Sequence, residues 1–272
     1  MANGRDQILE GGLLDVGPSL QPGETLDSVC RGQVQLIQRS AGYRFSVDAL
    51  LLAAFANRPR GKVVDLGTGC GIVAVLLAKR GARSVVGVEL QPGLAQLALR
   101  NVSLNRCDEQ VHIVNADLRD LRATLPSGGF DLAVSNPPYI ARRAGHLNPD
   151  GEKAVARHEV CCALDDVTRA ARYLLHDGGG LRLIFPSSRL VELLRSLASA
   201  GLEPKRMRLV HTVVNRPAKL VLLEAIKAAR VDLEVQPPLY LHDESGAYTP
   251  EVERILADAT ACMDVCEPIA EG

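Results

Sequence analysis

The spacing of apolar and polar residues changes near residue 60, and from there it predicts alternating strands and helices. Short β-branched runs alternate with longer amphipathic segments, which is typical of an α/β sandwich with a mainly parallel sheet. The predicted strands are residues 62–66, 84–89, 111–115, 130–135 and 181–185. The predicted helices are residues 72–80, 92–105, 160–175 and 190–200. Ligands of such sheets bind outside the carboxyl ends of the strands, so functional side chains are expected there.

The later part of the chain predicts a change from this alternation. Two strands near residues 205–212 and 220–225 leave no room for a helix between them, which predicts an antiparallel hairpin. Three glycines, 178–180, are predicted to lead from a helix into the strand 181–185, and Ser187 or Ser188 to cap the helix that follows. Thr249-Pro250 predicts a further helix start.

The first sixty residues are expected to hold a strand at 34–38 and an apolar helix at 48–56. We therefore divide the chain into an N-terminal extension packing near a cofactor site (residues 1–56), a catalytic domain (57–230) and an acidic C-terminal extension (231–272).

The composition changes this picture little, because 47% hydrophobic and 23% charged residues are typical of a globular protein. Arg and Lys interrupt every apolar stretch before it reaches transmembrane length, and the first residues do not form a secretory signal. Seven cysteines, with Cys161 and Cys162 adjacent, indicate reduced thiols. We expect a cytoplasmic protein without a membrane segment or a bound metal.

The charge distribution is uneven although the net charge is only −1. Residues 201–230 carry seven Lys and Arg, whereas residues 231–272 carry ten Asp and Glu. Basic groups near a catalytic loop would suit a polyanionic substrate, and solvated faces are the alternative interpretation. The candidate contacts with such a substrate are Arg142, Arg143, Arg157, Lys205, Arg206 and Arg208.

A glycine loop joins the first strand of the alternating pattern to its helix. Gly67, Gly69 and Gly71 allow the backbone to pass close to a ligand. The loop lacks the Lys-Ser/Thr of a phosphate-binding P-loop, and its G-x-G-x-G spacing differs from the dinucleotide fingerprint G-x-G-x-x-G. Asp65 would place negative charge near a pyrophosphate, so it better suits a cationic amino group. S-adenosylmethionine has such a group and no phosphate.

Carboxylates also close the next two predicted strands. Glu89 is placed to accept the ribose hydroxyls of a cofactor, a feature shared with NAD enzymes. Asp117 could accept from the adenine amino group or cap the next segment, and Phe45 could pack near the methionine end of the cofactor or in the core. The candidate cofactor-binding residues are Phe45, Asp65, Gly67, Thr68, Gly69, Gly71, Glu89, Leu90, Asn115, Ala116, Asp117, Leu118 and Asn136.

A rigid polar loop follows the apolar run 130–135. It consists of Asn136, Pro137, Pro138 and Tyr139, and its prolines restrict the backbone. The Asn136 amide oxygen and the Pro137 carbonyl suit the two N–H bonds of an amino group, and Tyr139 offers a flat face to a flat ring. Taken alone, the segment is better explained as an ordinary turn after a strand. Beside the glycine loop, it predicts a catalytic loop that methylates a planar amino nitrogen.

Together these motifs resemble the class I S-adenosylmethionine-dependent methyltransferases. Within them, the runs 24–27, 42–52, 156–159, 225–227, 237–240 and 246–249 resemble the bacterial tRNA1(Val) adenine-N6 methyltransferase family. This resemblance implies a Rossmann-like, doubly wound, mainly parallel seven-stranded sheet with helices on both faces and an antiparallel last strand. It also implies S-adenosylmethionine as cofactor and a tRNA partner that is methylated on the N6 amino group of adenine-37.

Other functions remain open from the sequence. The loop at Asn136 also resembles that of the glutamine-N5 methyltransferases of release factors, although nothing here resembles their N-terminal helical domain. A different RNA, a non-catalytic cofactor-binding module and a nicotinamide oxidoreductase are further alternatives. Arg157, His158 and Glu159 could contact RNA or form a cap or salt bridge.

Overall fold

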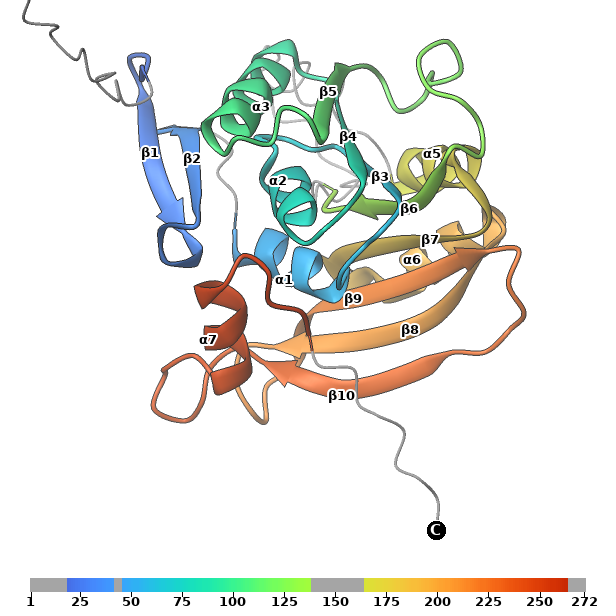
Figure 1. Ribbon diagram of the computed structural model, residues 1–272. Coiled ribbons are helices and arrows are strands. Elements are labelled where there is room, and N and C mark those ends of the chain that lie inside the picture. The colour runs from blue at the N-terminus through green and yellow to red at the C-terminus, as the bar shows by residue number, and fades with distance from the viewer. Residues whose placement is uncertain (1–18, 42–45, 138–163, 264–272) are drawn as a thin grey trace, which may run out of the picture.

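The main sheet of the protein has eight strands in the order β10-β8-β9-β7-β6-β3-β4-β5 (Figure 1). The computed structural model describes residues 19–41, 46–137 and 164–263. The strands are β3 Lys62–Leu66, β4 Ser84–Glu89, β5 Val111–Asn115, β6 Phe130–Ser135, β7 Leu175–Pro186, β8 Leu202–His211, β9 Ala218–Lys227 and β10 Glu234–Tyr240. Neighbouring strands are parallel except that β9 is antiparallel to both β7 and β8. The predicted α/β class and the β8–β9 hairpin are confirmed.

The expected strand number of seven is wrong because β10 adds an eighth strand at the sheet edge. It pairs in parallel with β8, and its register shifts between Gln236 and Leu239, where Pro237 and Pro238 lie. Proline has no backbone N–H to donate to a ladder, so such a segment is tolerated at an edge. Residues of the acidic C-terminal segment therefore belong to the main sheet.

Helices cover both faces of this sheet (Figure 1). Helices α1 Val47–Phe55, α2 Ile72–Lys79, α3 Pro92–Leu104 and α7 Pro250–Ala257 share one hydrophobic cluster, and α5 Leu164–Leu174 and α6 Leu190–Ser199 share the other. Val63 and Val64, successive residues of β3, are buried in opposite clusters. The alternating side chains of a strand thus serve both layers, which makes the doubly wound arrangement that the sequence predicted.

The segment around β7 differs from the sequence prediction in two ways. The strand begins at Leu175, directly after α5, so Gly178–Gly180 lie inside it, where the β6–β7 register shifts and Gly178 has a φ of +85°. Ser187 and Ser188 belong to a 3₁₀ turn, η2 Ser187–Arg189, and neither side chain caps α6. The Ser187 hydroxyl instead donates to the Ala218 carbonyl at 2.6 Å.

A two-stranded hairpin precedes the main sheet. It consists of β1 Glu24–Val29, which the sequence pattern missed, and the predicted β2 Val34–Arg39. The Arg100 guanidinium of α3 pairs with Glu24 at 2.6 Å, which holds the hairpin against α3.

At the other end of the chain, the predicted helix start at Pro250 is confirmed as α7. Within the described part of the chain, no helix is long and apolar enough to cross a membrane.

Candidate functional site

The glycine loop between β3 and α2 has one open side. Gly67, Gly69 and Gly71 have φ values of +77°, +58° and +85°, a region that L side chains rarely adopt. The N–H groups of Gly67 and Thr68 both donate to the Val88 carbonyl at 2.9 Å, which fixes the loop to β4. A Cβ atom added at Gly67 would meet no other atom of the described residues within 4 Å, so these residues leave the space beside it free for a ligand.

Asp65 presents a buried carboxylate below this loop. It is 1% exposed and accepts the Thr68 hydroxyl at 2.6 Å. Burial raises the pKa of the Asp65 carboxyl to about 7, although the hydrogen bond from Thr68 lowers it. A cationic group bound here would favour the ionised form of Asp65. The position therefore fits the ammonium group of an amino-acid-like ligand.

Glu89 connects the glycine loop to the end of β4. One carboxylate oxygen accepts the Gly69 N–H at 2.9 Å and the other accepts the Gln91 N–H at 2.8 Å. A carboxylate has about four lone-pair positions, so each oxygen can accept one further hydrogen bond. Glu89 can thus order the loop and still accept two hydroxyl groups.

The end of β5 completes this side of the site. The Asn115 amide donates to the carbonyls of Glu89 and Leu90 at 2.8 and 3.0 Å, and the Ala116 N–H donates to the Glu89 carbonyl at 3.1 Å. Leu118 is buried in the core. These contacts order the turn that presents Glu89; direct cofactor contacts of these residues stay a prediction.

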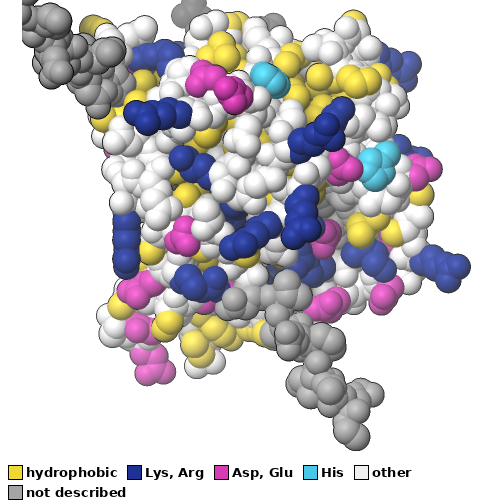
Figure 2. Space-filling model, in the orientation of Figure 1, with side chains coloured by type: hydrophobic (Ala, Val, Ile, Leu, Met, Phe, Trp, Pro, Cys, Tyr) yellow, Lys and Arg dark blue, Asp and Glu magenta, His cyan; other side chains and the backbone are white. Residues whose placement is uncertain are grey.

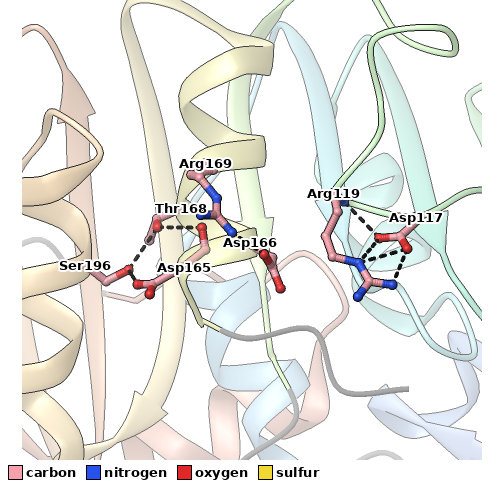
Figure 3. Close-up of polar contacts among 7 residues, drawn as sticks. All are labelled: Asp117, Arg119, Asp165, Asp166, Thr168, Arg169 and Ser196. Atoms are coloured by element: carbon pink, nitrogen blue, oxygen red, sulfur yellow. Dashed lines mark hydrogen bonds and ion pairs between the residues drawn. The ribbon is translucent and has the colours of Figure 1, made fainter. Parts of the chain in front are cut away.

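Asp117 forms a local pair with Arg119 at the end of β5 (Figure 3). Its carboxylate accepts the Arg119 backbone N–H at 2.9 Å and also binds the Arg119 guanidinium. The side-chain bond from Arg119 lowers the pKa of Asp117 below its ordinary value. The structure thus gives Asp117 a role in its own turn, and a contact with adenine stays a prediction.

Asn136 lies at the same sheet edge as the glycine loop. It follows β6, which is hydrogen-bonded to β3, and the fully buried Ser135 hydroxyl donates to the Leu66 carbonyl at 2.8 Å. Asn136 and Gly67 each lie one residue beyond this bond. Ser135 is a functional residue that the sequence motifs do not include, and its signal is a hydroxyl at the end of a mainly apolar strand.

Part of the predicted site lies outside the described residues. This applies to Phe45, Pro138, Tyr139, Arg142, Arg143, Arg157, His158 and Glu159. Just before the undescribed residues 138–163, Pro137 is buried, and just after them α5 begins at Leu164. The start of α5 is joined to α6 because Asp165 accepts the Ser196 hydroxyl at 2.6 Å, and Ser196 in turn contacts the Thr168 hydroxyl at 2.9 Å (Figure 3).

Both arginines of the expected basic surface at residues 205–208 make contacts within the fold, and their contact with a substrate stays a prediction. Arg206 lies over the Phe55 ring, 4.4 Å from its centroid, and pairs with Glu224 at 3.0 Å. Arg208 makes two bonds to Glu251, at 2.6 and 2.8 Å. Both guanidinium groups join elements of the fold. Lys205 is 3.6 Å from Asp232.

Comparison with known proteins identifies this arrangement. Residues 46–189, which contain the glycine loop, Glu89 and Asn136, match the family model described as "Methyltransferase small domain". The chain belongs to this methyltransferase family. The match confirms the methyltransferase interpretation over the alternatives of a nicotinamide oxidoreductase and an inert binding module.

Curated relatives of this methyltransferase extend the likeness over most of the chain. A protein of Porphyromonas gingivalis (strain ATCC 33277), named tRNA1(Val) (adenine(37)-N6)-methyltransferase, is 31% identical over 80% of this chain and 89% of its own length. One of the same name from Photobacterium profundum is 28% identical over 80% of this chain and 91% of its own length. A crystal structure of a predicted O-methyltransferase from Agrobacterium tumefaciens has a TM-score of 0.64 and 26% identity, covering 79% of this chain and 97% of that one.

S-adenosylmethionine is the cofactor of this methyltransferase, and the described residues fit it. The buried Asp65 carboxylate suits the ammonium group, the Glu89 carboxylate suits the ribose, and no other described atom fills the space beside Gly67. No group of three or more His, Cys, Asp and Glu among the residues that the structure describes is placed to hold a metal ion.

Proposed function

We propose that this methyltransferase transfers the methyl group of S-adenosylmethionine to the N6 amino group of adenine-37 in a tRNA. Its curated relatives carry this activity in their names and match about four-fifths of the chain. The structural observation that carries the proposal is the Ser135–Leu66 bond, which places Asn136 at the edge where the glycine loop begins. A tRNA substrate also supports the expected cytoplasmic location.

The cofactor roles follow from the positions of the acidic side chains. Asp65 binds the ammonium group, Glu89 accepts the ribose hydroxyls, and Asp117 accepts from the adenine amino group. Gly67 leaves the backbone open to the cofactor, Gly71 allows the loop to pass close to Ala98 of α3, and Thr68 orders Asp65 through its hydroxyl. The neighbouring candidates are Phe45, Leu90, Asn115, Ala116 and Leu118.

Asn136 and Pro137 contribute to catalysis by positioning the adenine amino group. The lone pair of an adenine amino group is delocalised into the ring, so this nitrogen is a weak nucleophile. The Asn136 amide oxygen and the Pro137 carbonyl each accept one N–H bond, which aligns the lone pair for attack. Bound S-adenosylmethionine supplies a methyl group on a sulfonium leaving group. Positioning of two reactants accounts for most of the rate enhancement.

The methyl transfer to the adenine amino group does not require a strong base. The nitrogen lone pair forms the new N–C bond, and the electron pair of the S–C bond returns to sulfur. The cationic nitrogen then loses one proton to water. The proposal also gives Pro138 and Tyr139 their predicted roles in the catalytic loop, with Tyr139 stacking on the adenine, which must be turned out of its loop to react. Anticodon-loop bases are unpaired, so this step costs less there than in a duplex.

Labelled S-adenosylmethionine, incubated with the full chain and with tRNA that lacks the modification, tests this proposal. Digestion of the tRNA to nucleosides should give label in N6-methyladenosine, and Asn136→Ala should abolish it. Label in another nucleoside, or in protein glutamine when release factor is added, would show that the substrate assignment is wrong.

A further inference from the structure

Three strands extend past the end of β6 and form a wall beside Asn136. Ser135, the last residue of β6, pairs with Leu183 on β7, and Leu183 pairs with Leu223 on β9. Three more pairs follow between β7 and β9, ending at Pro186 and Leu220. At about 3.3 Å per residue, the strands extend roughly 10 Å beyond Ser135.

This wall lies on the side of β6 opposite to the cofactor loop. In the strand order β8-β9-β7-β6-β3, the wall is formed by β7, β9 and β8, whereas β3 leads into the glycine loop. Figure 1 shows the turn between β8 and β9 at the end toward which the arrow of β8 points. A substrate whose reactive group lies over Asn136 therefore extends along the wall, because the cofactor occupies the other side.

Two unpaired cations lie at the top of this wall. Of the seven basic residues between 201 and 230, four contact acidic side chains, namely Lys205, Arg206, Arg208 and Lys227. Arg216 and Lys219 are exposed, and among the described residues neither side chain has an ion-pair or hydrogen-bond partner. Arg216 lies in the turn between β8 and β9, and Lys219 is the second residue of β9.

A third exposed cation, Arg195, lies on α6, which follows η2 directly. The Ser187–Ala218 hydrogen bond of 2.6 Å ties η2 to the first residue of β9. A hollow of about 420 Å³ beside η2 is lined by Arg189 and Arg195 and also by the carboxylates of Asp165 and Glu192. Arg189 is neutralised by Glu192 at 2.6 Å, but Arg195 is exposed and has no such partner in the described ranges. We call Arg195, Arg216 and Lys219 the basic ridge.

Position distinguishes the basic ridge from other cations on the surface. Figure 2 shows the face formed by α1, α2 and α7, where Lys and Arg side chains are spread among Asp and Glu side chains. On this face, the number of positive charges alone therefore does not indicate a binding surface. The ridge is different because it combines free cations with the carboxyl edge of the sheet, two to three strands from β6, which is about 10 to 15 Å.

We propose that the basic ridge binds the phosphate backbone of the nucleotides next to the target adenine. The inference rests on the proposed function, since it takes RNA as the substrate. Exposed Lys and Arg that contact phosphates release counterions, and they position a nucleic acid without reading its sequence. The ridge thus orients the anticodon loop, while the loop at Asn136 selects the amino group.

The test compares two double variants of the full chain that lose the same charge. Arg216→Gln with Lys219→Gln removes ridge cations, and Arg60→Gln with Arg83→Gln removes two exposed cations just before β3 and β4, at the opposite edge of the sheet. Binding of unmodified tRNA is measured over a range of salt concentrations, together with the Kd for S-adenosylmethionine. The ridge variant should bind tRNA about 10-fold or more weakly and lower the slope of log K against log salt by about 1 to 2.

The expected controls are an unchanged cofactor Kd in both variants and wild-type tRNA binding in the Arg60/Arg83 variant. If the Arg216/Lys219 variant binds tRNA with wild-type affinity and salt slope, the inferred role of the basic ridge is wrong but the proposed function stands. An equal loss of tRNA affinity in both double variants would have the same meaning. If the wild-type protein neither binds nor methylates tRNA, the proposed function fails and the ridge fails with it. Loss of methylation of a protein substrate only, with tRNA methylation intact, would also overturn the inference.

Discussion

Asn101 on α3 hydrogen-bonds to both backbone polar groups of Ile37 on β2. Its amide oxygen accepts the Ile37 N–H at 2.7 Å, and its amide nitrogen donates to the carbonyls of Ile37 and Cys70 at 3.0 and 2.9 Å. One helical turn later, Asn105 repeats the pattern with Gln35, at 3.0 and 2.7 Å. The two side-chain amides thus form hydrogen bonds with the backbone at the edge of β2, as a neighbouring strand would. Asn101 also links that edge to the glycine loop.

Asn101→Leu should therefore lower the free energy of unfolding strongly. The variant keeps the size of the side chain but leaves three buried backbone groups without partners, since Asn101 is fully buried. We expect a loss of about 3 kcal/mol. Asn105→Leu is the matched control, because water can replace its bonds at a more exposed position, and it should cost less than about 1 kcal/mol. Equal losses in urea unfolding would contradict this role of Asn101.

Gly67→Ala should weaken cofactor binding without an unusual loss of stability. Gly67 and Gly81 both have positive φ, +77° and +97°, and a Cβ atom at either position would meet no atom of the part of the chain that the structure describes within 4 Å. Gly81→Ala is therefore a control for backbone strain, which should lower the free energy of unfolding by about 1 to 2 kcal/mol in both variants. Calorimetric titration should show an S-adenosylmethionine Kd at least about 10-fold higher for Gly67→Ala only. Identical affinities would mean that the cofactor does not pass beside Gly67.

Glu89→Gln should raise the Kd for S-adenosylmethionine by about 10- to 100-fold. Glutamine offers one acceptor oxygen, so it cannot accept both the Gly69 and the Gln91 N–H, and it loses capacity for the ribose. Glu109→Gln changes an exposed carboxylate and should bind the cofactor normally. Unaltered binding in Glu89→Gln would show that this carboxylate serves only the fold.

Asp65→Asn should stabilise the cofactor-free protein at high pH. The pKa of Asp65 rises from 3.8 to about 7 on folding, so the folded state holds an extra proton between these values and loses stability as pH rises through them. Asparagine retains an acceptor for Thr68 and carries no charge. The gain over wild type should therefore be larger at pH 8 than at pH 5, on the order of 3 kcal/mol at pH 8.

Thermal unfolding at both pH values measures this effect. Saturating S-adenosylmethionine should remove the advantage of Asp65→Asn, because the bound ammonium group stabilises the wild-type carboxylate. A difference in Tm that is constant between pH 5 and pH 8 would contradict a buried, titrating Asp65.

The strands around the site could be predicted from sequence with their bounds. Strands β3, β4, β5 and β6 are short apolar runs between turn residues, and their polar ends identified Asp65, Glu89 and Asn136. The edge strand β10 was missed because its two prolines argue against a strand. Pattern alone does not show that such a segment is tolerated at a sheet edge.

The partners of charged side chains could not be predicted from the sequence. Arg208 forms its ion pair with Glu251, 43 residues away and on another element, so the sequence shows the cation but not its neutralisation. Ser135 was missed for a similar reason, since its partner Leu66 is 69 residues away. Contacts between elements that are distant in the chain decide both cases.

Mass-spectrometric sequencing of tRNA after reaction tests the central claim most directly. Unmodified tRNA is incubated with S-adenosylmethionine and either wild-type protein or Asn136→Ala, and its nuclease fragments are sequenced. We predict one added methyl group, on adenine-37, with the wild type, and none with Asn136→Ala although its cofactor Kd stays within a few-fold. A methyl group on another nucleotide, or an undiminished reaction in Asn136→Ala, would contradict the account.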